Sequence, residues 1–172
     1  MLPDVATVER ILRREGGWSD HPDDRGGMTN YGITLATLKS LDPNATPDVL
    51  RNLTKEEASG ILLQVYWVET GFSRLWVSEP LAELLLDTAV HSGGPNAVRM
   101  LQRAVSVDSD GIIGPITEEA VKRLNGPHLM ALVVSERMLW LANLVSMDPS
   151  QGVFLRGWTR RLREFVLEIP FS

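Results

Sequence analysis

The chain has 172 residues, of which 17 are Lys or Arg, 22 are Asp or Glu and none is Cys, giving a formal net charge of −5. This length allows one domain, or one domain with a small second region, built around a sizeable core. The absence of cysteine excludes disulfides, thiolate metal sites and a cysteine nucleophile, and the negative charge argues against nucleic-acid binding by the chain as a whole.

The first predicted helix covers residues 4 to 15, with Asp4 or Pro3 as its start signal. Its apolar positions recur at helical spacing: Val5, Val8, Ile11 and Leu12. Gly16 and Gly17 follow it and supply the left-handed conformation that a helix C-cap needs. Glu15 therefore ends the helix and faces the negative end of the helix dipole, which disfavours an ionised carboxylate. A carboxylic acid that keeps its proton is what glycosidic-bond cleavage requires of a general acid.

A loop rich in Gly, Asp and Pro follows this helix, and residues 28 to 33 are predicted to form a short hairpin or extended stretch. Asp24 lies nine positions after Glu15 in a polar setting that should keep it ionised. The Thr29 hydroxyl is suited to hold a water or a sugar oxygen. An acid, a second carboxylate and a positioning hydroxyl would make a hydrolytic site. A solvated helix end followed by a surface turn is the alternative, and the residue types alone leave both open.

Two further helices are predicted before residue 70. Thr34 caps a short helix that runs through Leu41, and Thr54 with Glu57 forms a capping box before a helix that ends near residues 66 to 68. Trp67 lies at the end of that helix. Aromatic residues in this position usually belong to the core, but an indole can also stack on the apolar face of a sugar ring, and both roles are open for Trp67.

An apolar helix is predicted from Pro80 through His91, suited to the centre of a bundle. Asp87 and His91 are four positions apart and so share one face of this helix. A polar pair on an apolar helix is either a satisfied structural contact or part of a substrate cleft.

The remaining chain predicts more helices and no flexible linker. A helix follows Gly93-Gly94-Pro95, and a sharp loop over residues 107 to 117 leads to a helix capped by Thr117. A long helix from Gly126 to about Met147 is apolar on most sides and is expected to be buried. The last helix starts near Phe154, and Trp158 is expected to pack it onto the core. Four arginines make this end basic, which indicates either a solvated helix face or a patch facing an anionic polymer: Arg156, Arg160, Arg161 and Arg163.

The stretch from residue 15 to 34 resembles the motif of the glycoside hydrolase family 108 muramidases, which are lysozyme-like enzymes. That motif has the form Glu-Gly-Gly, then Asp, then Gly-Gly-x-Thr-x-x-Gly-Ile-Thr, and here it reads Glu15-Gly16-Gly17, Asp24 and Gly26 to Thr34. The Asp-Gly-Ile-Ile-Gly-Pro-x-Thr string at residues 110 to 117 is similar to one in predicted peptidoglycan-binding domains that follow the family's catalytic half. Related sequences tend to carry Asn where His91 stands, which leaves His91 unassigned.

The resemblance implies a mainly α, lysozyme-like fold with a small extended or β hairpin beside the cleft. Residues 1–92 would form the catalytic region and residues 93–172 a helical peptidoglycan-binding region packed closely on it. The implied activity is hydrolysis of the β-1,4 bond between N-acetylmuramic acid and N-acetylglucosamine, with no metal or organic cofactor. Glu15 would be the general acid, Asp24 would stabilise charge or activate water, and Thr29 would position that water or the sugar. Tyr31, Trp67 and Asp87 would bind substrate.

Three other functions remain open: a lytic transglycosylase that uses the same glutamate, a noncatalytic peptidoglycan-binding module, and a helical phage or secretion-apparatus component that uses the fold only as a scaffold. The glycine-framed Glu15 and Asp24 argue against the last, since a scaffold has no need of them. The N-terminus shows no secretory signal pattern, and no run of about eighteen apolar residues predicts a transmembrane segment. We therefore expect a monomer made in the bacterial cytoplasm that reaches peptidoglycan glycan strands after release. A holin or a secretion machinery would release it, as for an endolysin of phage or prophage origin.

Overall fold

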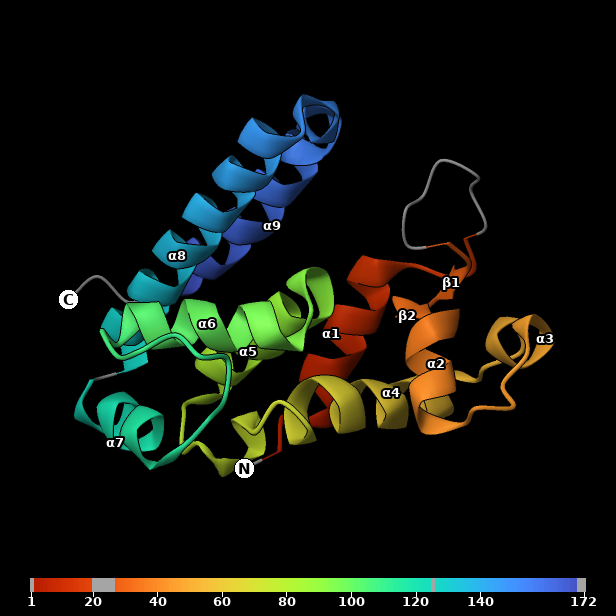
Figure 1. The fold of residues 1–172 in the computed structure, drawn as a ribbon, viewed down its shortest axis with the longest axis horizontal. Helices are drawn as coiled ribbons and strands as arrows, with labels where there is room; N and C mark the ends of the chain where they lie inside the picture. Colours follow the sequence, from red (N-terminus) through yellow and green to blue (C-terminus); the bar gives the residue numbers. More distant parts are fainter. Residues whose placement is uncertain (1, 20–26, 125, 170–172) are drawn as a thin grey trace. The chain divides into compact units, whose positions relative to one another are not determined.

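The computed structural model describes residues 2–19, 27–124 and 126–169, and its backbone forms two compact units, Leu2–Glu69 and Thr70–Ser172. We call them the N-terminal unit and the C-terminal unit. The fold is mainly helical with a two-stranded antiparallel sheet, as the sequence predicts (Figure 1).

The N-terminal unit consists of short helices around one hairpin. Its elements are α1 (Val5–Glu15), β1 (Thr29–Asn30), β2 (Ile33–Thr34), α2 (Leu35–Leu41), α3 (Pro47–Arg51), α4 (Lys55–Leu63) and the π-helix η1 (Gln64–Val68). The helix starts agree with the predicted caps: the side chains of Asp4, Thr34 and Thr54 each accept a backbone N–H of the following turn. Glu57 completes the predicted capping box by accepting the Thr54 N–H at 2.8 Å.

The C-terminal unit is built around one buried helix. Its elements are the 3-10 helix η2 (Phe72–Arg74), α5 (Glu79–Ser92), α6 (Gly94–Ala104), α7 (Pro115–Arg123), α8 (Gly126–Met147), the 3-10 helix η3 (Pro149–Phe154) and α9 (Leu155–Glu168). Nine consecutive residues of α5, from Leu81 to Ala89, are buried, and α5 contacts α6, α8 and α9. The prediction that this apolar helix lies at the centre of a helical bundle is confirmed.

Two details of the C-terminal unit differ from the prediction. Thr117 does not cap α7, because the helix already starts at Pro115 and the Thr117 side chain is buried, where its hydroxyl accepts a hydrogen bond from Gln102 at 3.3 Å. Helix α8 is not buried on most sides: Met138 and Leu139 are 55% and 57% exposed. A buried stripe on one face of α8 is enough to pack it on α5, α6 and α9.

Helix α8 is also long and apolar enough to cross a membrane by length and composition alone, with a mean hydropathy of 1.4 over its most apolar window. One such helix is weak support for a membrane span, because the core helix of a soluble protein meets the same criteria. Here the middle of the helix carries Arg137, whose guanidinium forms an ion pair with Asp87 on α5.

Candidate active site

Glu15 is the last residue of α1, as predicted. The helix ends there because Gly16 takes a left-handed φ of +81° and returns its N–H to the Leu12 carbonyl. Ile11 and Leu12, one turn before Glu15 on the same side of α1, anchor the helix in the core and are 0% and 2% exposed. The Glu15 side chain itself is only half-buried. A rigid helix thus presents this carboxylate at its end without enclosing it.

The predicted hairpin lies beside this helix end. Its strands pair Thr29 with Thr34 and Asn30 with Ile33, and a two-residue turn at Tyr31 and Gly32 joins them. Both turn residues have positive φ, +54° and +77°, as tight hairpin turns require. The buried Asn30 side chain donates to the Leu50 and Arg51 carbonyls at 3.0 and 3.1 Å and so fixes the hairpin to α3.

Gly32 places the hairpin turn directly against Glu15. A Cβ atom on Gly32 would lie 2.7 Å from Cγ of Glu15, 3.0 Å from its Cβ and 3.2 Å from Oε2. Real Cβ atoms essentially never come within 3.0 Å of another heavy atom, so only glycine fits here without a shift. The glycine of the Tyr-Gly-Ile-Thr sequence therefore has a specific function: it lets the backbone approach the Glu15 side chain.

A short backbone bridge also ties the chain after Glu15 to the hairpin. Ser19 and Thr29 exchange two hydrogen bonds, Ser19 N–H to the Thr29 carbonyl at 2.8 Å and Thr29 N–H to the Ser19 carbonyl at 2.9 Å. Thr29 and Tyr31 are both half-exposed. The structure thus brings Glu15, Thr29 and Tyr31 to one hairpin, while Asp24 lies outside the described residues.

Trp18 is a feature of this region that the sequence analysis missed. The Arg51 guanidinium lies over its ring, 4.6 Å from the ring centroid. Trp18 is half-exposed and immediately precedes the Ser19 bridge, so an aromatic face lies within three residues of Glu15. Its position after Gly-Gly could have marked Trp18 as a candidate site residue, because a tryptophan in a polar glycine loop has no helix face to pack on.

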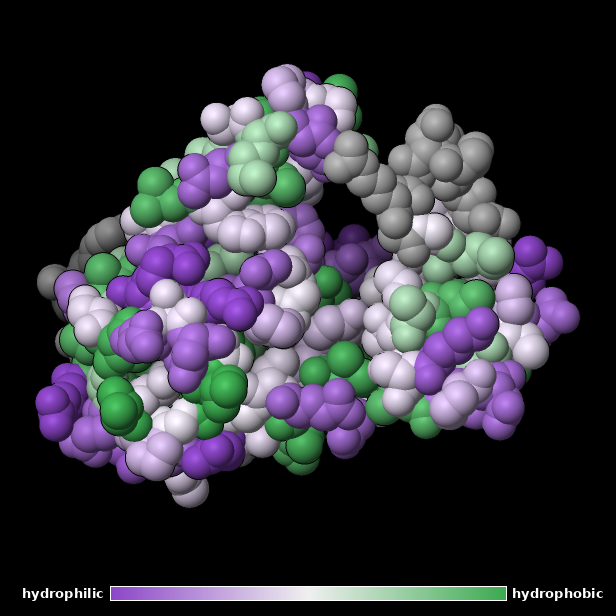
Figure 2. All heavy atoms as spheres, in the orientation of Figure 1, coloured by the Kyte–Doolittle hydropathy of each residue, from purple (hydrophilic) through white to green (hydrophobic). Residues whose placement is uncertain are grey.

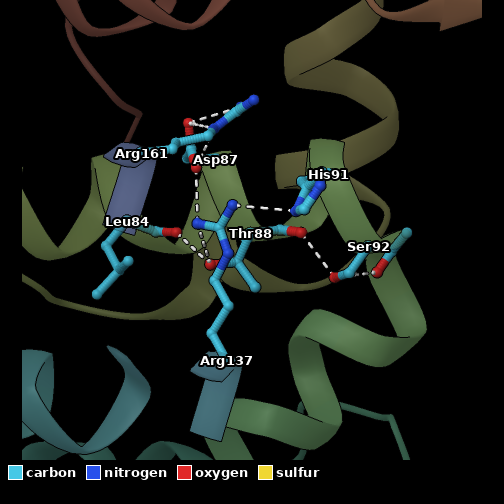
Figure 3. A network of polar contacts seen from close by, with 8 residues as sticks. Leu84, Asp87, Thr88, His91, Ser92, Arg137 and Arg161 are labelled. Carbon is cyan, nitrogen blue, oxygen red and sulfur yellow. Dashed lines mark hydrogen bonds and ion pairs between the residues drawn. The ribbon is translucent and has the colours of Figure 1, made fainter. Parts of the chain in front are cut away.

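The two other predicted substrate-binding residues are buried. Trp67, in η1, and Asp87, in α5, are both 0% exposed. Each was open to a structural interpretation from sequence, and the direct contacts of Asp87 are shown in Figure 3. The proposed substrate-binding roles of Tyr31, Trp67 and Asp87 stay predictions.

Asp87 is the centre of a buried ionic network in the C-terminal unit (Figure 3). Its Oδ2 accepts from Arg137 Nη1 at 2.7 Å, and Arg161 Nε lies 2.9 Å from both of its oxygens. Burial raises the pKa of Asp87, but the charges of Arg137 and Arg161 outweigh it and hold that pKa below its usual value. Neither arginine was predicted from sequence to be a partner of Asp87. For Arg137 a signal was present, because an arginine inside an apolar helix such as α8 indicates a buried partner.

His91 belongs to the same network, and the prediction that it shares a face with Asp87 is confirmed. Its Nδ1 lies 3.2 Å from Arg137 Nη2, and the edges of Trp140 and Trp158 approach its ring. Because a guanidinium only donates, Nδ1 must be the unprotonated acceptor. Burial, followed by the charges of Arg137 and Arg161, lowers the pKa of His91 from 6.5 to about 4, against the opposing effect of Asp87.

Among the described residues, no group of three or more His, Cys, Asp or Glu side chains could hold a metal ion. A half-buried glutamate at a helix end, beside a glycine hairpin in a mainly helical chain, is the arrangement that the resemblance to lysozyme-like glycoside hydrolases implies.

Comparison with known proteins narrows this class. The glycosyl hydrolase 108 family matches residues 8–93, and a predicted peptidoglycan domain matches residues 96–163. The solved structure of Brucella abortus SagA is 33% identical, with a TM-score of 0.83 over 97% of this chain and 95% of that chain. A comparison with curated proteins found no match. The chain belongs to the glycosyl hydrolase 108 family, and it is a muramidase-type glycoside hydrolase that acts on peptidoglycan.

The two family matches and the backbone packing divide the chain differently. Along the chain, the boundary between the two family matches lies between residues 93 and 96, whereas the boundary between the compact units lies between Glu69 and Thr70. Helix α5 thus falls in the glycosidase match but packs with the helices of the C-terminal unit. The predicted division after residue 92 stays a prediction.

Proposed function

We propose that Glu15 is the general acid of an N-acetylmuramidase that cleaves the β-1,4 bond between N-acetylmuramic acid and N-acetylglucosamine. The observation that carries this proposal is the contact between Glu15 and the hairpin: only a glycine at position 32 leaves room for the glutamate side chain. A purely structural helix end has no need of such a close approach. The half-exposed side chain is also accessible to a polymer.

In the proposed reaction, the Glu15 carboxyl protonates the glycosidic oxygen as the bond to the anomeric carbon breaks. The sugar develops oxocarbenium-like charge, and water attacks the anomeric carbon to give a reducing end. Thr29, on the strand beside Glu15, would position that water or a sugar hydroxyl. On the basis of its place in the family motif, we assign to Asp24 the role of stabilising the charge on the sugar or of taking the proton that the attacking water loses.

The test is product analysis on purified peptidoglycan with wild type and Glu15→Gln. The amide has nearly the same size but carries no acidic proton, so we expect kcat to fall by about 10²–10⁴. Glu9→Gln is the matched control, because Glu9 lies on the same helix and pairs with Lys55 at 3.2 Å, and its activity should match wild type. The release of reducing ends measures the rate of cleavage, and mass spectrometry of the fragments identifies which bond is cleaved and which end group forms.

Two outcomes would contradict the proposal. Full activity of the Glu15→Gln protein would show that another group supplies the proton. Fragments ending in 1,6-anhydro sugars in place of reducing ends would show that the enzyme is a lytic transglycosylase, in which a sugar hydroxyl replaces water as the nucleophile.

A further inference from the structure

A pocket of about 360 Å³ lies in the C-terminal unit, between the loop that precedes α7 and the first turns of that helix. Its lining combines four apolar residues with one acid and one base: Val107, Pro115, Ile116, Ala120, Glu119 and Arg123. Ile116 is 76% exposed, so its aliphatic side chain is accessible to a ligand. Figure 2 shows hydrophobic and hydrophilic side chains side by side over α7.

The loop beside this pocket is held rigidly. The buried Gln102 side chain donates to Asp110 Oδ1 at 2.7 Å and to the Ile112 carbonyl at 3.0 Å, and its oxygen accepts the Gly111 N–H at 2.8 Å. The Asp110 carboxylate also accepts the Ile112 N–H at 2.8 Å. A loop fixed in this way leaves little conformational entropy to lose on binding, which is how preformed sites gain affinity.

The charges at the pocket are a mixed pair. Glu119 and Arg123 lie one helical turn apart with 3.3 Å between Oε1 and Nε, and their side chains are 56% and 75% exposed. An exposed pair of this kind adds only about 0.3–0.5 kcal/mol to a helix, so both charges remain open to exchange their partner for a ligand. The other four lining residues are apolar and suit small aliphatic groups.

We propose that this pocket binds the peptide stem of peptidoglycan. A peptide stem carries methyl side chains together with free carboxylates and an amine, which match the apolar lining residues, Arg123 and Glu119 respectively. A neutral glycan strand fits less well, because sugar rings favour aromatic platforms and none of the six lining residues is aromatic. The inference takes only the identity of the polymer from the function proposed above, and does not depend on the chemistry of Glu15.

The proposal is tested by co-sedimentation of the full chain with purified sacculi, in a Glu15→Gln background so that the polymer stays intact. Arg123→Gln should weaken binding about tenfold, which corresponds to about 1.4 kcal/mol for one charged contact. Ala120→Phe should do the same by filling the pocket. Lys122→Gln is the matched control, because it removes the same charge from the same helix outside the pocket lining, and should bind like the unaltered protein.

A second arm identifies the ligand chemistry. Because the peptides cross-link the sacculus, amidase treatment releases soluble glycan strands, which are therefore immobilised on beads beside fragments of intact peptidoglycan. Binding to the peptide-free strands should fall to the level of the Arg123→Gln protein. The released peptide fraction should compete for intact sacculi and shift the amide signals of residues 115 to 123 in NMR spectra.

Three results would overturn the inference: equal binding to immobilised peptide-free strands and to immobilised intact peptidoglycan, equal loss with Lys122→Gln and Arg123→Gln, or full binding by both Arg123→Gln and Ala120→Phe. The proposed catalytic function is tested separately, by the loss of turnover in the Glu15→Gln protein. A failure of either proposal is therefore visible without the other.

Discussion

Glu15 in the N-terminal unit and Asp87 in the C-terminal unit are both helix carboxylates, yet their surroundings are opposite. Glu15 ends its helix, is half-buried and faces a glycine turn. Asp87 lies inside its helix, is 0% exposed and is held by two guanidiniums. A carboxylate whose oxygens are saturated by fixed cations is stabilised in its ionised form and cannot readily give or take a proton.

This difference separates a carboxylate suited to chemistry from one suited to structure. A substrate can approach Glu15, whereas the Asp87 network connects three helices that are distant in sequence: α5, α8 and α9. The ion pairs span 50 and 74 positions along the chain. We therefore expect changes at Asp87 to act on stability and changes around Glu15 to act on turnover.

The largest expected effect on stability follows from Asp87→Asn. The amide keeps the shape of the side chain but leaves Arg137, which is 1% exposed, without its counter-charge. Breaking a buried pair in this way costs about 3–5 kcal/mol of unfolding free energy, measurable by urea denaturation. Glu119→Gln, which breaks an exposed pair, should cost less than about 1 kcal/mol. A loss of the same small size for Asp87→Asn would refute the structural role.

The pH dependence of stability gives a second, slightly smaller effect. His91 has a folded pKa of about 4 against an ordinary 6.5, so the unfolded chain binds more protons between these values. The free energy of unfolding therefore falls as the pH drops from about 6.5 to about 4, by an amount on the order of 3 kcal/mol. The groups that face the ring are Arg137, Arg161 and Asp87, and Asp87 itself titrates below this window because its pKa is lowered.

His91→Asn isolates this contribution. Asparagine retains an oxygen acceptor for Arg137 but does not titrate, so the acid-side slope of stability against pH should flatten while stability at pH 8 changes little. His128→Asn, at an exposed histidine on α8, is the matched control for the substitution itself. An unaltered slope in His91→Asn would mean that other groups cause the acid sensitivity.

Much of the fold is predictable because its signals are local. Asp4, Thr34 and Thr54 cap their helices as expected, and Gly16 ends α1. Each of these features depends on residues within one helical turn, which the sequence displays directly. The prediction that Thr117 caps a helix was wrong for the opposite reason, since its hydroxyl accepts a hydrogen bond from Gln102, a residue 15 positions away.

The candidate site is predictable in part for the same reason. Glu15, Thr29 and Tyr31 lie in one continuous motif, so recognising the motif recognises the site. The Arg137 and Arg161 partners of Asp87 depend on the packing of α8 and α9 against α5, and no local pattern specifies which arginine faces inward. Arg161 shows this clearly: it lies among four arginines of similar sequence context, yet its side chain is only 15% exposed.

A smaller effect on stability than those at Asp87 and His91, and the sharpest test of the Glu15 geometry, comes from Gly32→Ala. The new Cβ would meet Glu15 Cγ at 2.7 Å, and the backbone would keep a φ of +77°, so we expect a loss of about 1–2 kcal/mol of stability. We expect a larger loss in turnover, about tenfold or more, because the glutamate must move away from the hairpin. Reducing-end assays on peptidoglycan measure the turnover.

Gly27→Ala separates strain from displacement. Gly27 has a similar φ of +68°, but a Cβ there meets nothing within 4 Å. It should therefore lose a comparable amount of stability and keep its activity. Equal turnover in the two alanine proteins would mean that the position of Glu15 against the hairpin does not matter for catalysis, and the contrast between the accessible and the buried carboxylate would lose its functional meaning. Reduced turnover in Gly32→Ala alone would tie activity to the one contact that only glycine permits.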